Sequence, residues 1–225
     1  MSSISDTASL LADRTRAAFC LALLDGRAWT AGELARSAGV SASTASEQLS
    51  RLVEGGLLAE ERQGRHRYVR LAGQEAASLI EAVASYAPAS PRPRNLRQSG
   101  QAGAEARART CYDHLAGELG VALADAMVSR GLVSDDAGLT VTPAGRDWLA
   151  EALGYRHAAG TRRPLVRSCL DWTERRSHLA GAMGAALCAT SLERQWVRRI
   201  GSGRAVKVTP AGAGAFRDLL GAEVG

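Results

Sequence analysis

Two cysteines and two histidines in the second half of the chain are the side chains best suited to bind a metal or to carry thiol chemistry. They are Cys111, His114, Cys169 and His178. Two thiolates and two imidazoles could form a tetrahedral zinc site. Cys111 and His114 are three residues apart on an expected helix, close enough to share a face, whereas Cys169 and His178 are nine apart. An internal repeat assigns the two histidines to separate units, which argues against a shared metal site. We therefore predict no metal site and no cofactor.

Three roles remain open for this region. The first is a pocket for an organic effector, with the candidate residues Cys111, His114, Cys169, Asp171, Trp172, Arg175 and His178. The second is a purely structural role, since nearby carboxylates such as Asp113 are ordinary partners for imidazole. The third is a thiol-responsive or metal-responsive site built from the two Cys and two His residues. Trp172 and Arg175 could also pack against the first half of the chain.

The sequence carries no pattern typical of an enzyme active site. There is no GxSxG, no Walker loop, no GxGxxG after an expected strand and no HExxH. Cys111 and His114 offer a nucleophile and a base, but nothing in the sequence identifies an oxyanion hole. We therefore predict that the protein is not an enzyme.

A polar helix face followed by a basic hairpin could do a different kind of chemistry, the recognition of DNA. The stretch "SASTASEQLSRLVEGGLL" starts with helix-capping residues, carries an apolar stripe at helical spacing and stops at Gly55-Gly56. Its outer face offers short hydroxyls, an amide that can bind adenine and a guanidinium that can bind guanine. The candidate base-reading residues are Ser43, Thr44, Ser46, Gln48 and Arg51.

The segments "LLAEERQ" and "RYVRL" around Gly64 are typical of two strands joined by a turn. Basic side chains at this turn could neutralise DNA phosphates; the candidates are Arg62, Arg65, His66 and Arg67. The expected order of elements is that of a winged helix-turn-helix: a helix, a short helix, a turn, a polar helix and a basic hairpin. In that motif the third helix enters the major groove of DNA, and the hairpin, called the wing, contacts the DNA backbone. Acidic side chains near this helix and hairpin reduce the local positive charge, so we expect two copies of the domain to bind DNA together.

With these motifs in place, residues 9–87 resemble the ArsR family of bacterial winged-helix repressors. The resemblance is carried by "DRTRAAFCLALLDGR", by "ELARSAGVSASTASEQLSRLVEGGLL" and by "GRHRYVRL". It follows the family pattern S-x-S-x-x-S-x-H-L-x-x-L, with Gln48 in place of the usual histidine, while "ELARSAGV" lacks the cysteine motif of the metal-sensing members. The resemblance implies a homodimer, paired through the first helix and the helix after the wing. It also implies a two-fold operator that the dimer leaves when a signal binds.

Several elements must position these residues. We expect a first helix over residues 9–27, and a short second helix that begins with a Thr30 and Glu33 capping box and ends at Gly39. The last helix of this half runs from about Gln74 to Tyr86. A segment rich in proline and arginine, without apolar periodicity, follows it. We predict a DNA-binding domain over residues 1–87, a linker over 88–104 and a regulatory domain over 105–225.

The second half contains an internal repeat. "HLAGELGVALADAMVSRGLV" from His114 matches "HLAGAMGAALCATSLERQWV" from His178, and each is followed by a strand-like segment and by "TPAG", at Thr142 and Thr209. Two units of helix and wing are implied. The predicted fold is therefore mainly α with small β-hairpin wings: an N-terminal winged helix-turn-helix plus a C-terminal domain of winged-helix-like units.

Composition agrees with a DNA-binding protein. The 225 residues carry a net charge of +5 at pH 7, which favours a polyanionic partner. The four cysteines form no CxxC pair and follow no secretory signal, as expected for a reducing cytoplasm, and no apolar run approaches the roughly 18 residues of a membrane span. We predict a cytoplasmic, homodimeric transcriptional repressor that binds double-stranded DNA and responds to a small-molecule effector. The alternative is a tandem winged-helix scaffold that binds protein.

Overall fold

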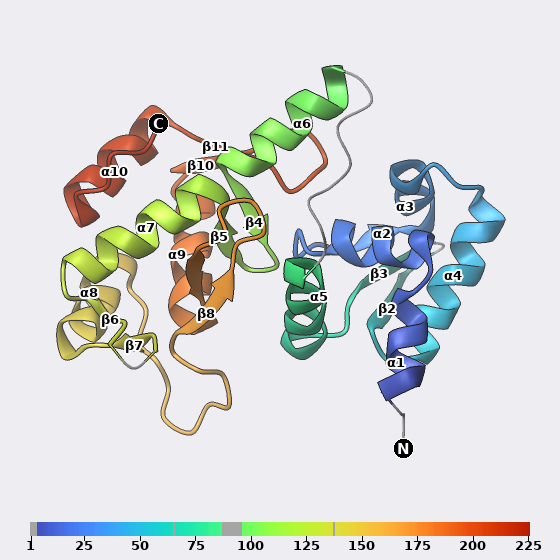
Figure 1. Cartoon of the computed structure of the whole chain (residues 1–225), viewed down its shortest axis with the longest axis horizontal. Helices are drawn as coiled ribbons and strands as arrows, with labels where there is room; N and C mark the ends of the chain where they lie inside the picture. The colour runs from blue at the N-terminus through green and yellow to red at the C-terminus, as the bar shows by residue number, and fades with distance from the viewer. Residues whose placement is uncertain (1–3, 65, 87–95, 137) are drawn as a thin grey trace. The chain divides into compact units, whose positions relative to one another are not determined.

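The structure is a computed structural model that describes residues 4–64, 66–86, 96–136 and 138–225. The chain divides into two compact units, Met1–Val83 and Ala84–Gly225, whose elements are labelled in Figure 1. Helices dominate, and the strands form short antiparallel hairpins, so the predicted fold class is confirmed. Within the described residues, no helix is long and apolar enough to cross a membrane.

The N-terminal unit begins with two helices where the sequence predicted one. They are α1 (Ile4–Leu11) and α2 (Arg14–Leu23). The break falls at Asp13, whose carboxylate accepts hydrogen bonds from the backbone amides of Thr15 and Arg16, both at 2.9 Å. A side chain that caps the first amides of a helix fixes its start, so the apolar periodicity across Asp13 was misleading.

The next two helices have the predicted capping. In α3 (Ala31–Ala38), Thr30 and Glu33 form the capping box and Gly39 ends the helix with a φ of 69°. The hydroxyl of Ser41 accepts from the amide of Thr44 at the start of α4 (Ala42–Glu54). Two glycines follow α4, and the second of them, Gly56, has a φ of 75°, which is why the helix stops there.

A small sheet and one more helix complete this unit. Strands β1 (Trp29–Thr30), β3 (His66–Leu71) and β2 (Leu58–Gln63) are antiparallel and lie in that order. Helix α5 spans Gln74–Tyr86, as the sequence predicts. The core between helices and sheet is built from fully buried apolar side chains, including Phe19, Leu23, Leu34, Leu49, Leu52 and Leu71.

The predicted linker differs from the structure in its second part. Residues 88–95 lie outside the described residues, but Leu96–Arg107 form helix α6. The polar C-terminal end of α6 is tied to the C-terminal unit, because the backbone carbonyl of Glu105 accepts from Arg109 at 3.0 Å and the Glu105 carboxylate lies 3.4 Å from Arg204. The contact with Arg204 joins residues far apart in the sequence, so apolar periodicity could not reveal this helix.

The C-terminal unit consists of two copies of one arrangement. The first copy is a hairpin, β4 (Arg109–Cys111) and β5 (His114–Ala116), then α7 (Gly117–Ser129), a second hairpin, β6 (Val133–Ser134) and β7 (Thr140–Val141), and α8 (Pro143–Leu153). The second copy is β8 (Arg167–Leu170), β9 (Ser177–Ala180), α9 (Gly181–Glu193), β10 (Val197–Arg199), β11 (Val206–Val208) and α10 (Pro210–Leu220). The internal repeat is therefore structural.

The shared "TPAG" segment has the same role in both copies. Thr142 and Thr209 each cap the following helix by accepting from the glycine amide of the motif at 3.0 Å. Proline occupies the first turn, where it needs no hydrogen-bond donor. A Cβ on Gly145 or Gly212 would lie 2.0 Å from a backbone carbonyl oxygen before the wing, so only glycine fits there.

The two copies pack through their leading hairpins. Strands β5 and β9 contact one another, α9 contacts β5, and α7 contacts β9, as Figure 1 shows for the green and orange elements. The apolar core of the unit draws residues from both copies, including Leu119, Leu123, Met127, Leu187 and Phe216. Each copy therefore buries its helices against the other.

Candidate functional site

The outer face of α4 has the exposure expected of a helix that enters a DNA groove. Ser43, Ser46 and Arg51 are exposed, while Thr44 and Gln48 are half-buried. The inner face of the same helix, with Ala45, Leu49 and Leu52, is completely buried. The apolar stripe predicted from the sequence thus fixes which side of α4 faces outward.

Gln48 is bound within its own domain. The guanidinium of the buried Arg16 donates to Gln48 Oε1 at 2.5 Å and to the backbone carbonyls of Leu10 and Ser9 at 2.6 and 2.8 Å. These bonds tie the end of α1 and the middle of α4 to α2. Gln48 therefore helps to hold α4 in place through its oxygen, and the predicted contact of its amide with adenine stays a prediction.

Arg51 is held by its own helix. Its Nη2 lies 2.8 Å from the Glu47 carboxylate one turn earlier, and both side chains are more than half exposed. Exposed pairs at this spacing contribute only a few tenths of a kcal/mol, about 0.3–0.5. Arg51 can therefore exchange Glu47 for a base or a phosphate at little energetic cost.

One acid in the wing binds two of its cations. Arg62 and Arg67 lie opposite each other across β2 and β3, and Glu60 contacts both, at 2.9 and 2.7 Å. A hydrogen bond from Arg62, together with the charge and hydrogen bond of Arg67, lowers the pKa of the half-buried Glu60 carboxyl, although desolvation opposes the change. His66 belongs to β3, whereas Arg65 lies outside the described residues. The wing is thus less positive than its arginines alone suggest.

The structure brings the two Cys and two His residues of the second half together. We call Cys111, His114, Cys169 and His178 the Cys–His cluster. All four side chains are buried, and their potential ligand atoms lie within 4.8 Å of one another. The Nε2 atoms of His114 and His178 are 3.1 Å apart. The expectation that the repeat separates these histidines is wrong, because the two copies pack face to face through the hairpins that carry them.

The expected helical placement of Cys111 and His114 is also wrong. They are a cross-strand pair of the β4–β5 hairpin, and Cys169 and His178 are the matching pair of the β8–β9 hairpin. Each helix starts only at the glycine after "HLA". Residues paired across a hairpin can share one face whatever the length of the loop.

The two hairpins share a sequence motif, but no single offset between the copies aligns both its cysteines and its histidines. The first copy reads "RTCYD" followed directly by "HLAG", and the second reads "RSCLD", then the six residues 172–177, then "HLAG". The inserted residues lengthen the turn between the strands without changing the pairing of cysteine with histidine. Allowing for this insertion would have aligned the cysteines as well as the histidines.

Each histidine faces a carboxylate, and each carboxylate faces an arginine. His178 Nδ1 lies 3.2 Å from Asp171 Oδ2, and His114 Nδ1 lies 3.4 Å from Asp113 Oδ1. Arg163 donates to Asp113 at 2.7 Å. Burial opposes the ionised form of both acids, but hydrogen bonds from the histidines and the arginine charges outweigh it, so the pKa values of Asp113 and Asp171 are lowered.

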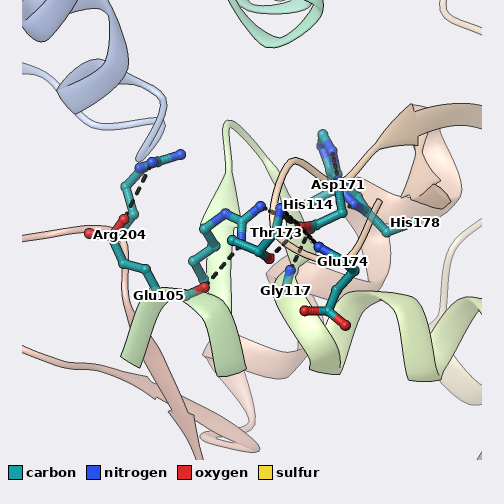
Figure 2. Close-up of polar contacts among 9 residues, drawn as sticks. Glu105, His114, Gly117, Asp171, Thr173, Glu174, His178 and Arg204 are labelled. Carbon is teal, nitrogen blue, oxygen red and sulfur yellow. Dashed lines mark hydrogen bonds and ion pairs between the residues drawn. The ribbon is translucent and has the colours of Figure 1, made fainter. Parts of the chain in front are cut away.

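Asp171 is the centre of a buried polar network, drawn in Figure 2. Both of its oxygens lie 2.9 Å from Nη2 of the fully buried Arg109. It also accepts from the Gly117 amide at 2.7 Å and from the Thr173 hydroxyl at 2.6 Å. Because these donors come from both copies, Asp171 joins them while it orients His178.

The other predicted ligand residues surround this network. The ring of Trp172 lies over the Arg109 guanidinium at 4.9 Å, and Arg175 is exposed in the turn with a φ of 55°. The cavity between the copies, lined by Leu115, Gly120, Leu123, Leu179, Gly184 and Leu187, holds only about 10 Å³. That space suits at most one water molecule, and none of the predicted effector residues lines it.

The thiol of Cys111 is neutral in this arrangement. A hydrogen bond with Cys169 and burial raise the pKa of Cys111 to about 12, although contacts with both histidines oppose the change. Burial also raises the pKa of Cys188, which lies outside the cluster, to about 12. Neither thiol is therefore a nucleophile at neutral pH without a cation.

Comparison with known proteins finds relatives among transcription factors. Residues 11–61 match a family model described as a helix-turn-helix domain. An uncharacterized HTH-type transcriptional regulator, YdfF of Bacillus subtilis, is 39% identical over 223 residues, which cover 98% of each chain.

Solved structures resemble only part of the chain. The homodimeric winged helix-turn-helix DNA-binding domain of Mb0332 from Mycobacterium bovis is 30% identical and covers 36% of this chain and 73% of its own, with a TM-score of 0.33. The transcriptional repressor BigR from Xylella fastidiosa is 26% identical and covers 39% of this chain and 88% of its own, with a TM-score of 0.36.

Proposed function

We propose that this chain, which belongs to the helix-turn-helix transcriptional regulators, is an ArsR-type winged-helix repressor that binds a two-fold DNA operator as a homodimer. Helix α4 would enter the major groove, and the β2–β3 wing would contact the flanking backbone. The C-terminal unit would modulate this binding in response to a signal. Because the target is DNA, we place its action in the bacterial cytoplasm and give it no enzymatic role.

The exposed outer face of α4 is the observation that carries the proposal. Ser43, Ser46 and Arg51 are available there, and the buried side of the helix is anchored by three apolar residues of the core. Arg16 and Gln48 then fix the helix against α2. Base contacts from a rigidly held helix are those that specify sequence.

The proposed dimer is supported by an exposed apolar surface on the helices that the ArsR resemblance assigns to pairing. On α5, Leu79, Val83 and Tyr86 are 36%, 48% and 90% exposed and share one face at helical spacing. In the first helices, Ile4 and Leu21 are 91% and 39% exposed. Apolar side chains that share one face, as on α5, favour association with another surface, here a second copy of the same helix.

DNA binding by the full chain tests the proposal directly. A labelled duplex from upstream of the protein's own gene should give a saturable shift, resistant to unlabelled nonspecific DNA, with two chains bound per site. Its affinity should fall steeply between two salt concentrations, since arginines replace counterions on the phosphates. A scaffold that binds only protein would give no saturable shift at either salt, and that result would reject the proposal.

A further inference from the structure

We propose that the Cys–His cluster binds one Zn²⁺ ion through Cys111 Sγ, His114 Nε2, Cys169 Sγ and His178 Nε2, as a closed four-ligand site that locks the two copies of the C-terminal unit together. The donor set is that of tetrahedral structural zinc sites, and two sulfurs with two nitrogens favour this ion over Mg²⁺ or Ca²⁺. The site lies within the C-terminal unit, so the inference does not depend on DNA binding.

The separation of the two histidine nitrogens fits such an ion. With Zn–N bonds of about 2.0–2.1 Å in a tetrahedron, two nitrogens lie about 3.3 Å apart, close to the observed 3.1 Å between Nε2 atoms. The remaining donors are also near, since all four ligand atoms lie within 4.8 Å. Small rotations of the thiols suffice to complete the tetrahedron.

The carboxylates on the far side of both rings fix which nitrogen is available. Asp113 and Asp171 face the Nδ1 atoms, and an ionised carboxylate can only accept, so each Nδ1 should carry the proton. Both Nε2 lone pairs then point at the same small space. Two lone pairs 3.1 Å apart suit a shared cation, and a carboxylate behind each imidazole is the usual outer support of a metal-bound histidine.

The charges around the cluster also balance when a divalent ion is bound by two thiolates. Asp171 is paired with Arg109 at 2.9 Å and Asp113 with Arg163 at 2.7 Å, so neither acid brings a net charge. On binding, Zn²⁺ replaces the two thiol protons, which pass to solvent, and the two imidazoles remain neutral. The resulting site is neutral overall, as a buried centre requires.

Burial and connectivity indicate a structural site. His114 and His178 are 0% exposed, and Cys111 and Cys169 are 6% and 5% exposed, so no coordination position opens to solvent. One Cys–His pair comes from each copy, and the ion would be shared between them. A metal bound in this way contributes its binding energy to the folding of the unit.

A disulfide between Cys111 and Cys169 is the competing use of these thiols. It would employ the two cysteines but would leave both Nε2 atoms facing each other with no cation between them. A disulfide would therefore explain the proximity of the two cysteines but not that of the two histidines. The experiments below separate the two outcomes.

Metal content and coordination of the untagged full chain test the site. Protein purified under reducing conditions from zinc-replete cells should contain one zinc per chain by mass spectrometry. X-ray absorption at the zinc edge should give two sulfurs at about 2.3 Å and two nitrogens at about 2.0 Å. Co²⁺ added to the metal-free protein should produce thiolate charge-transfer and tetrahedral ligand-field absorption that saturate at one equivalent. These measurements need no variant.

Matched variants then assign the ligands. Cys169→Ala and His178→Ala should abolish stoichiometric zinc and alter the Co²⁺ spectrum. Cys188→Ala should change neither, since this equally buried cysteine of α9 lies outside the cluster. Asp113→Ala should weaken Co²⁺ binding by about 10–100-fold while keeping the two-sulfur spectrum, as expected for a positioning residue behind a ligand.

Three results would overturn the proposal. One is folded wild-type protein without zinc and without a thiolate band on Co²⁺ addition. Another is a zinc edge spectrum that lacks two sulfurs. The third is a Cys111–Cys169 disulfide found by intact mass after the thiols are blocked inside the cells. DNA binding by the same samples is measured separately, so a failed metal site and a failed regulator are distinguishable.

Discussion

His114 and His178 meet with their Nε2 atoms 3.1 Å apart, although they belong to different copies of a repeated motif. The Cβ atom of each histidine packs against a glycine from the helix of the opposite copy. A Cβ on Gly184 would lie 3.2 Å from His114 Cβ, and one on Gly120 would lie 3.4 Å from His178 Cβ. The copies are therefore held through their histidines, and whatever binds the pair should stabilise the whole C-terminal unit.

Removal of zinc should destabilise that unit selectively. A ligand held at a thousand times its dissociation constant adds about 4 kcal/mol to folding, so chelation should lower the midpoint of the C-terminal unit by roughly 8–16 °C. Calorimetry of the full chain should show this shift while the transition of the N-terminal unit is unchanged. The same chelator should have no effect on Cys169→Ala, and an equal shift there would contradict the prediction.

The Arg16–Gln48 hydrogen bond should contribute measurably to the N-terminal unit. Gln48→Ala leaves a buried guanidinium nitrogen without this partner, which should lower the free energy of unfolding by about 1–3 kcal/mol. Urea denaturation measures the change, and Ser46→Ala on the exposed face of α4 is the control, with an expected effect within about 0.5 kcal/mol. A double-mutant cycle with Arg16→Ala isolates the pair. A coupling energy of zero would show that Gln48 is free to read a base.

Glu60 should restrain the wing. Glu60→Gln removes the charge that pairs with Arg62 and Arg67, so both arginines become available to phosphates. Affinity for nonspecific duplexes should rise, and the slope of log K against log salt should steepen. Arg67→Ala should have the opposite effect and reduce that slope by about one. Fluorescence anisotropy over a salt series measures both, and equal slopes for the two variants would contradict a role of the wing on the backbone.

Local signals made most of the N-terminal unit predictable. The Thr30 and Glu33 capping box, the Gly39 stop and the Gly55-Gly56 pair mark helix ends within a few residues of sequence, so α3 and α4 followed directly. Asp13 is an equally local cap, and it was overlooked because apolar periodicity continues across it. Helix α6 carries no apolar period and depends on contacts around Glu105.

The Cys–His cluster was beyond such local signals. Its members approach because two hairpins from separate copies pack together, which depends on the whole C-terminal core. The sequence did hold a pointer, since both copies contain Arg, then Thr or Ser, then Cys, and an Asp two residues after the cysteine. Because six residues are inserted before His178, the Arg, Cys and Asp positions of the two copies align at one offset and the histidines at another.

The capping box should make stability depend on pH in a known direction. The backbone amide of Thr30, and then its hydroxyl, donate to Glu33 and lower the pKa of that carboxyl. The stabilisation is therefore complete above the unfolded-state pKa and is lost as the pH falls through the lower folded-state pKa. Urea unfolding of wild type and Glu33→Gln between neutral and acidic pH should show a difference that shrinks on acidification. A difference that grows would contradict this assignment.

The apolar face of α5 should decide whether the chain dimerises. Val83→Glu places a charge in the middle of the surface formed with Leu79 and Tyr86, and burying an unpaired carboxylate in an interface is costly. Light scattering should therefore show a shift from dimer to monomer. Leu170→Glu is the matched control, because Leu170 is exposed to nearly the same extent, 46% against 48%, but lies in the C-terminal unit. A monomer that cannot bind both half-sites should also lose operator affinity. A Val83→Glu protein that stays dimeric and binds DNA normally would show that the dimer interface is not on α5.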